Sequence, residues 1–277
     1  MTRPAPDPPE RWAAHRALAD IVARFRDGCA GIPRAAWRRW LLALGLGYLA
    51  TFLLLLALIA TVHTATADGA LWWEPRALDW IATRVPLSFS SAIWIQTFGT
   101  DIMLVFVILI GAGIAAWAAR PFPALTIAAA YLLTDLVVRA GWMLWNRPRP
   151  GIILDGAAAP GFASFPSGHT AKTLAVYGTL AYLWGRSSGN TAERLLAATV
   201  ALTIVGLVAI GRLRMGAHWP SDIAGGVIIG AAALATTIAA LRAATRRRDA
   251  TPPPNAPTAP APPASPDTPP PGNTASA

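Results

Sequence analysis

The sequence has very little cysteine and little charge. Cys29 is the only cysteine among 277 residues, and 13% of the residues are charged, against about 25% in an average soluble domain. A single cysteine excludes an intrachain disulfide and a metal site built from several thiolates. The shortage of charge excludes the surface of an ordinary water-soluble protein of this length, and it leaves long apolar runs to be explained.

Five long stretches contain no charged residue, and a sixth contains only Asp135 and Arg139. A helix needs about 20 apolar residues to cross the hydrocarbon core of a bilayer. We therefore predict an all-α, polytopic membrane protein with a bundle of six transmembrane helices, at residues 40–62, 101–119, 121–145, 169–186, 194–211 and 220–241.

The net charge of +9 does not predict binding to nucleic acid, because the basic residues cluster at the ends of the apolar runs. Membrane proteins carry their cytoplasmic anchors at such positions. If both termini are cytoplasmic, all of these anchors fall on one side: Arg34, Arg38, Arg39, Arg120, Arg186, Arg194, Arg242, Arg246, Arg247 and Arg248. We expect a multi-pass protein of a bacterial inner (plasma) membrane, whose first helix is an uncleaved anchor because a charged stretch precedes it.

The segments outside the predicted helices have compositions of their own. Residues 1–38 are basic, and apolar spacing between Pro9 and Arg26 predicts an amphipathic helix, either on the membrane surface or as an ordinary cytoplasmic helix. The connection at 64–100 is predicted to form interfacial helices on the outer side, because tryptophan favours the bilayer interface; it contains Trp72, Trp73, Trp80 and Trp94.

The C-terminal end differs from the membrane domain predicted at 39–242. Eleven prolines lie between Pro252 and Pro271, mixed with small and polar residues. Such a composition cannot bury apolar area, so residues 249–277 are predicted to be a disordered tail.

Three short polar clusters lie beside the apolar runs, on the side away from the basic anchors. They are Arg147-Pro148-Arg149-Pro150, Pro166-Ser167-Gly168-His169, and Arg212 with His218 and Asp222. Two of the four histidines of the chain belong to them. Cations and histidines gathered at one membrane face predict chemistry on a lipid phosphate.

The first two clusters suit an anion. The arginine fork matches phosphate oxygens in a bidentate way, although Arg147 and Arg149 taken alone are more typical of headgroup anchors. Ser167 and Gly168 precede a predicted helix, whose N-terminus offers free N–H groups to an anion. His169 is then placed beside that anion, unless it is merely a polar surface residue.

The third cluster suits a nucleophile. The spacing of His218 and Asp222 allows the carboxylate to reach a ring nitrogen, which fixes the tautomer and leaves the other nitrogen free to attack. Metal binding is the competing use of such a pair, but the further ligands of a catalytic metal are not apparent in the sequence. We predict a site without metal or other cofactor.

Together the clusters resemble the motifs of the type 2 phosphatidic acid phosphatase (PAP2) superfamily, which also includes vanadium haloperoxidases. The family pattern is Lys, six residues, Arg-Pro; then Pro-Ser-Gly-His; then Ser-Arg, five residues, His, three residues, Asp. The second element is complete at 166–169, and the others match at Arg149-Pro150 and at Arg212, His218 and Asp222. Two positions depart from the pattern, since Gly211 replaces the serine and Trp142 replaces the lysine.

The resemblance implies a role for each matching residue. His218 would be the nucleophile that forms a phosphohistidine, Asp222 would orient it, and His169 would protonate the leaving group. The remaining matches would hold the phosphate: Arg149, Ser167, Gly168 and Arg212.

A cation near Trp142 could replace the missing lysine. Arg139 and Lys172 are the candidates, and Arg139 is favoured because it lies on the same helix face as Trp142. The alternatives are an ion pair between Arg139 and Asp135, and a Lys172 side chain that extends to the interface. Arg147 is a further candidate for phosphate binding.

The predicted function is therefore hydrolysis of a membrane lipid phosphate or diphosphate at the outer face. The alternative is an altered family member that binds lipid phosphates without efficient hydrolysis, and it is motivated by Trp142. A vanadate-dependent peroxidase is disfavoured because those relatives are soluble. The expected partners are the bilayer and a lipid substrate, of which undecaprenyl diphosphate, phosphatidylglycerol phosphate, phosphatidic acid and phosphorylated lipid A are all candidates; no oligomeric state is predicted.

Overall fold

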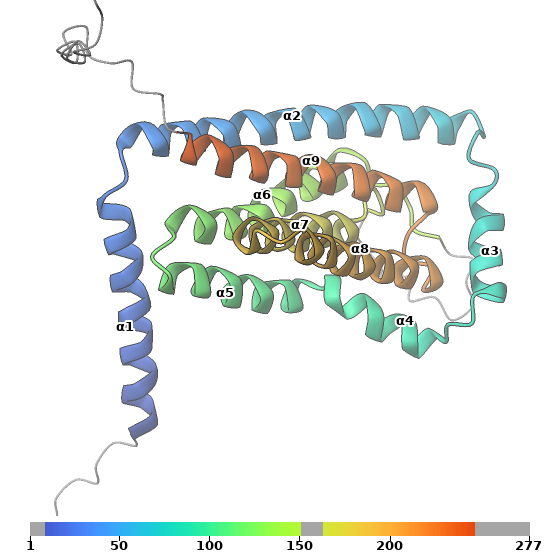
Figure 1. Cartoon of the computed structure of the whole chain (residues 1–277). Helices are drawn as coiled ribbons and strands as arrows, with labels where there is room; N and C mark the ends of the chain where they lie inside the picture. Colours follow the sequence, from blue (N-terminus) through green and yellow to red (C-terminus); the bar gives the residue numbers. More distant parts are fainter. Residues whose placement is uncertain (1–8, 151–162, 247–277) are drawn as a thin grey trace, which may run out of the picture. The chain divides into compact units, whose positions relative to one another are not determined.

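The structure is a computed structural model that describes residues 9–150 and 163–246. All regular structure in these residues is helical (Figure 1). The helices are α1 (Pro9–Ala30), α2 (Arg34–Ala67), α3 (Glu74–Arg84), α4 (Phe89–Gln96), the 3-10 turn η1 (Thr97–Gly99), α5 (Asp101–Trp117), α6 (Pro121–Leu144), α7 (Gly168–Ser188), α8 (Thr191–Arg214) and α9 (Pro220–Thr245). The predicted disordered tail at 249–277 lies outside the described residues.

Five segments of the described chain are long and apolar enough to cross a membrane. They are Arg34–Ala67, Phe89–Trp117, Pro121–Leu144, Thr191–Arg214 and Pro220–Thr245. The prediction of an all-helical membrane protein is therefore confirmed. The predicted span at 169–186 corresponds to α7, which is not among the five because its first turns carry polar residues such as His169 and Lys172. A crossing by α7 stays a prediction.

Helix α7 packs against α6, α8 and α9, and most of its first three turns is buried. Glycines of α9 allow the close approach. A Cβ atom on Gly226 would lie 2.7 Å from the Ser167 carbonyl oxygen, and one on Gly230 would lie 2.7 Å from that of Ala171. Small residues are typical of such close helix contacts in membranes. The approach places the second polar cluster, at the start of α7, directly against the third, at the start of α9.

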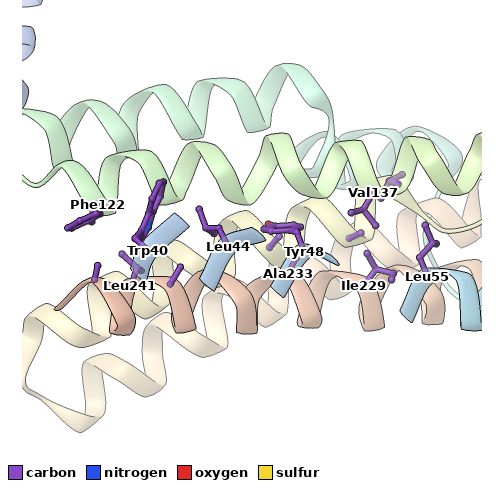
Figure 2. Close-up of a cluster of buried hydrophobic side chains, with 14 of the residues drawn as sticks. Trp40, Leu44, Tyr48, Leu55, Phe122, Val137, Ile229, Ala233 and Leu241 are labelled. Atoms are coloured by element: carbon purple, nitrogen blue, oxygen red, sulfur yellow. The ribbon is translucent and has the colours of Figure 1, made fainter. Parts of the chain in front are cut away.

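The largest apolar core joins α2, α6 and α9 (Figure 2). Trp40, Leu44 and Leu55 of α2 pack in it with partners from the other helices, which include Phe122, Val137, Ile229, Ala233 and Leu241. The polar atoms in this region are paired: the Trp40 Nε1 atom donates to Thr126 Oγ1 at 3.0 Å. In a bilayer such pairing is required because no water is available to replace the bond.

The two ends of the long helices differ in composition. At one end, arginines bond to carbonyl or hydroxyl oxygens, as Arg39 does to Ala243 and Arg186 to Thr245. At the other end, where α9 begins, α3 and α4 pack against α8 and carry exposed tryptophans (Figure 1). The predicted anchors up to Arg242 and the predicted polar clusters thus lie at opposite ends, while Arg247 and Arg248 lie outside the described residues and the membrane face of each end stays a prediction.

Candidate active site

The third cluster is assembled at the start of α9. The Asp222 side chain reaches back to the start of its own helix, where its Oδ2 atom accepts the Trp219 N–H at 2.8 Å. This is the geometry of a capping box. The His218 Nδ1 atom lies 3.5 Å from the same oxygen, so the predicted pair does come together. The histidine lies in the turn before α9 rather than in the helix.

The other nitrogen of His218 faces an arginine. Nε2 lies 3.4 Å from Arg149 Nη1, and because a guanidinium can only donate hydrogen bonds, Nε2 must carry the lone pair. Burial lowers the pKa of His218 to about 4, which the neighbouring Asp222 carboxylate opposes and the charges of Arg212 and Arg149 support. At neutral pH the ring is therefore uncharged, with its proton on the side of Asp222.

Two guanidinium groups lie near this ring. Arg149 donates to the carbonyl oxygens of Ala217 at 2.5 Å and Ala163 at 3.4 Å, and burial lowers its pKa. Arg212 of α8 donates to Gln96 Oε1 at 3.0 Å, while its buried Nε has no partner within the described residues. A buried guanidinium whose donors are not used up within the described chain is suited to bind an anion.

The second cluster forms the start of α7. Ser167 is the N-cap, and its Oγ accepts the Thr170 N–H at 3.5 Å. Its own N–H donates to the Asp222 carbonyl oxygen at 3.0 Å, which ties the start of α7 to the start of α9. His169 follows in the first turn, half-buried, with Arg212 and His218 among its electrostatic neighbours. The structure thus brings the second and third clusters together, as predicted.

Comparison with known proteins identifies this arrangement. The family model described as the PAP2 superfamily matches residues 123–246, a range that includes both histidines and all three clusters. The resemblance to the PAP2 superfamily is therefore confirmed for residues 123–246. None of the curated proteins gives a match.

Two solved structures are similar to this one, and the first of them shares its fold. The first transmembrane PAP2-type phosphatidylglycerolphosphate phosphatase from Bacillus subtilis has a TM-score of 0.56 and 23% sequence identity, covering 73% of this chain and 98% of its own. LpxE from Aquifex aeolicus has a TM-score of 0.47 and 23% identity, covering 60% and 93%.

Trp142 occupies the position of the PAP2 lysine. Its Nε1 atom donates to the Pro166 carbonyl oxygen at 3.1 Å, so α6 holds the turn that precedes α7. Gly168 packs against the same indole, since a Cβ atom there would lie 3.0 Å from Trp142 Cζ2. This close contact explains why a residue without a Cβ atom is present at position 168. The role of Gly168 in phosphate binding stays a prediction. Trp142 supports the motif by shape and by a hydrogen bond instead of by charge.

The two candidates for a replacement cation are both engaged by carboxylates. Arg139 Nε lies 2.5 Å from Asp135 Oδ2, which is the ion pair left open by the sequence. Lys172 Nζ lies 2.9 Å from Asp135 Oδ1 and also bonds to Asp101. Lys172 is 3% exposed, and its side chain ends on these two carboxylates. The alternative of a Lys172 side chain that extends to the interface does not match these contacts.

Arg147, the further candidate for phosphate binding, is buried in an ion pair of its own. It donates to Asp222 Oδ1 at 2.5 Å and to Glu74 Oε2 at 2.7 Å. Neither Glu74 nor Gln96, the partner of Arg212, was identified from the sequence. The signal for Glu74 was a lone acid between two tryptophans and a proline, while Gln96 had none. Within the described residues, no group of three or more His, Cys, Asp or Glu side chains could hold a metal.

A pocket of about 480 Å³ borders this ion pair. Glu74 and Arg147 bond to each other, so the surface left to a ligand is mainly apolar. The walls are formed by residues from the end of α2, the connection to α3, the segment that follows α6 and the turn before α9: His63, Thr66, Ala67, Gly69, Leu71, Trp72, Pro75, Trp145, Pro148 and Trp219.

Proposed function

We propose that this PAP2 protein is a membrane lipid phosphatase that hydrolyses a phosphomonoester or diphosphate through a phosphohistidine. One observation carries the proposal: the buried His218 ring lies between a carboxylate and a guanidinium, with Nδ1 3.5 Å from Asp222 Oδ2 and Nε2 3.4 Å from Arg149 Nη1. A neutral imidazole aimed at a phosphate-binding cation is an activated nucleophile. Arg149 and Arg212 would hold the phosphoryl oxygens in front of it, with Ser167 at the helix N-terminus.

The reaction would run in two balanced steps. His218 Nε2 attacks phosphorus, the bond from phosphorus to the lipid oxygen breaks, and His169 donates a proton to that oxygen. A water molecule then attacks the phosphohistidine, His169 takes up the proton of this water, and inorganic phosphate leaves. Asp222 stabilises the positive charge that the His218 ring acquires, and the two arginines stabilise the charge on the transferred group.

A lipid is the substrate class that fits the surroundings of the site. The clusters lie at the ends of helices that are long and apolar enough to cross a membrane, and the pocket beside Arg147 has mainly apolar walls. The similar protein from Bacillus subtilis is a phosphatidylglycerolphosphate phosphatase by its description. We place the site at the outer face of an inner membrane with both termini cytoplasmic, because the arginine anchors gather at the other end.

The test is phosphate release from purified protein supplied with the four candidate lipids in one detergent. His218→Ala should abolish release from every lipid that the wild type hydrolyses. His15→Ala, which removes an exposed histidine of α1, is the matched control and should leave the rate unchanged. Equal rates for wild type and His218→Ala would refute the nucleophile. Trapping of an acid-labile phosphoenzyme in wild type alone would support the intermediate.

A second function is favoured by Trp142. The lysine position of the PAP2 motif holds no charge, and both nearby cations are paired with carboxylates. A protein with fewer free cations at the phosphate could bind lipid phosphates and release them unhydrolysed. Turnover of any lipid phosphate by the wild type, abolished in His218→Ala, excludes this alternative.

A further inference from the structure

The segment between α2 and α5 contributes a buried carboxylate to the site. Glu74, in the first turn of α3, is 2% exposed. It lies outside the residues that match the PAP2 family model, 123–246. A carboxylate is rarely buried unless charged or hydrogen-bonding partners compensate it, so its partners indicate what it does.

Both oxygens of Glu74 are used. Oε2 accepts a hydrogen bond from Arg147 Nη2 at 2.7 Å, and Oε1 accepts the N–H of Ser221 at 2.8 Å. Ser221 is in the first turn of α9, where an N–H has no partner within its helix and a negative charge is favourable. One side chain thus fixes the position of both Arg147 and the start of α9.

Arg147 transmits this constraint to the proposed nucleophile. Its Nη1 atom donates to Asp222 Oδ1 at 2.5 Å and to the Ser221 hydroxyl at 2.7 Å. The rings of Trp145 and Trp219 lie near the guanidinium, at 5.4 and 5.7 Å from its carbon atom. The other oxygen of Asp222 faces His218. The contacts therefore form a chain from Glu74 through Arg147 and Asp222 to His218.

The charges along this chain suggest why Glu74 is needed. Arg147 alone would neutralise the Asp222 carboxylate, which must stabilise a positive His218 ring during phosphoryl transfer. With Glu74 present, two carboxylates share one guanidinium, and a net negative charge remains beside the ring. The same charge holds Arg147 in one orientation, which in turn holds the plane of the Asp222 carboxylate.

We propose that Glu74 is a positioning residue for the His218–Asp222 pair, acting through Arg147. The proposal rests on the proposed function, since it needs His218 to react. It means that α3 is part of the catalytic apparatus, although it lies outside the family match.

The experiment compares steady-state kinetics of full-length wild type and Glu74→Gln on whichever lipid phosphate the wild type hydrolyses. Glutamine keeps the shape but loses the charge, and its amide cannot accept from both Arg147 and Ser221. We expect kcat to fall by about 10- to 100-fold, as for other residues that orient a reactive group, with KM nearly unchanged. Glu74→Asp should recover part of the loss. The matched control is Asp79→Asn, an exposed acid on the same helix, which should leave both constants unchanged.

A second comparison separates positioning from general damage. If Glu74 acts through Arg147, then Glu74→Gln should lower kcat by a much smaller factor in an Arg147→Met background than in the wild type. Thermal unfolding in detergent gives the folded fraction of each variant, and kcat is referred to that fraction. If Glu74→Gln leaves kcat unchanged, or if its effect is the same in the presence and absence of Arg147, the proposal is wrong.

The failure of the proposed function gives a different result. A wild-type protein without any turnover contradicts the proposed phosphatase function. It also contradicts the role of Glu74, which needs a reacting His218. A wild type that is active through His218 while Glu74→Gln matches it contradicts only the role of Glu74.

Discussion

Two buried cations in this molecule each lie between two carboxylates. Arg147 lies between Glu74 and Asp222 at the start of α9, and Lys172 lies between Asp101 and Asp135 where α5, α6 and α7 meet. All three members of the first group are almost fully buried, whereas the Asp101 side chain in the second is 53% exposed. The first group also contacts His218 through Asp222. The comparison teaches that a similar arrangement of charges can contact a proposed nucleophile in one place and join three helices in another.

The largest expected effect is on the first group, at the residue that joins it to the nucleophile. Asp222→Asn keeps the size of the side chain but places an NH₂ donor against another donor, either Arg147 or the Trp219 N–H. It also no longer fixes the tautomer of His218. We expect kcat to fall by about 10⁴-fold, as when the carboxylate of a comparable His–Asp pair is replaced. Phosphate release measures it, with the exposed Asp20→Asn as the control. A variant that retains a tenth of the wild-type rate would contradict the assigned role of Asp222.

The second group should respond in stability and much less in activity. Lys172→Met leaves two carboxylates without their shared cation, which costs about 3–5 kcal/mol when both are buried. Because Asp101 is half-exposed, we expect the lower end of this range, measured by denaturant or thermal unfolding in detergent. Lys172→Met combined with Asp135→Asn should recover part of the loss.

Activity per folded molecule sharpens the same comparison. Lys172→Met should keep most of it, whereas Arg147→Met should lose nearly all of it. Equal losses would show that the two groups do not differ in function as their contacts suggest.

The first group contacts His218, the residue that makes the site sensitive to pH. The pKa of His218 is lowered to about 4 in the fold, against about 6.5 in an unfolded chain. The unfolded state therefore takes up this proton first, so the contribution of His218 to stability is complete above pH 6.5 and is lost as the pH falls from 6.5 to 4. The loss is at most about 3 kcal/mol.

The pH dependence of kcat/KM should report on the same His218 side chain. The acidic limb of the kcat/KM profile should fall near pH 4, because Nε2 of His218 loses its lone pair on protonation, whereas loss of the proton from His169, the proposed acid, sets the alkaline limb. An acidic limb with a midpoint near 6.5 would contradict the buried, neutral state of His218. Glu74→Gln and Lys172→Met can be compared in the same buffers.

The smallest effect is expected at the edge of the second group. Arg139 is 53% exposed on its side chain, and exposed ion pairs contribute about 0–1 kcal/mol. Arg139→Ala should therefore lower the free energy of unfolding by less than about 1 kcal/mol and leave the rate of phosphate release unchanged. The sequence favoured Arg139 over Lys172 as the more important cation, and the burial of Lys172 reverses that expected order. A larger loss of activity in Arg139→Ala than in Lys172→Met would restore the first interpretation.

The parts of this molecule that could be predicted from sequence depend on short-range patterns. Charge-free runs located α2, α5, α6, α8 and α9 because the bilayer sets their length and composition. The end of α2 was predicted at 62 but lies at Ala67, since several threonines there bond back to carbonyl oxygens one turn earlier. The clusters that hold His169 and His218 were found because fixed spacings at helix starts bring them together.

The contacts that were missed depend on how distant segments pack. Glu74 and Gln96 lie in a connection whose sequence predicts only an interfacial location, and their partners, Arg147 and Arg212, are 73 and 116 residues away. The hydrogen bond from Trp142 to the Pro166 carbonyl oxygen was missed for a different reason. At this position the PAP2 pattern shows only that a lysine, and with it a charge, is missing. The roles of the site residues in catalysis remain predictions for the experiments above.

Asp222 makes three hydrogen bonds and one further polar contact through its backbone oxygen and its two carboxylate oxygens. Its backbone oxygen holds the start of α7, one carboxylate oxygen holds Arg147, and the other caps α9 and faces His218. Gradual heating or added denaturant should therefore not produce a state that is folded at this end yet inactive. Loss of turnover and the change in the fluorescence of Trp219 should follow the same unfolding curve. Random mutagenesis should find no single second-site change that restores activity to a variant of Asp222.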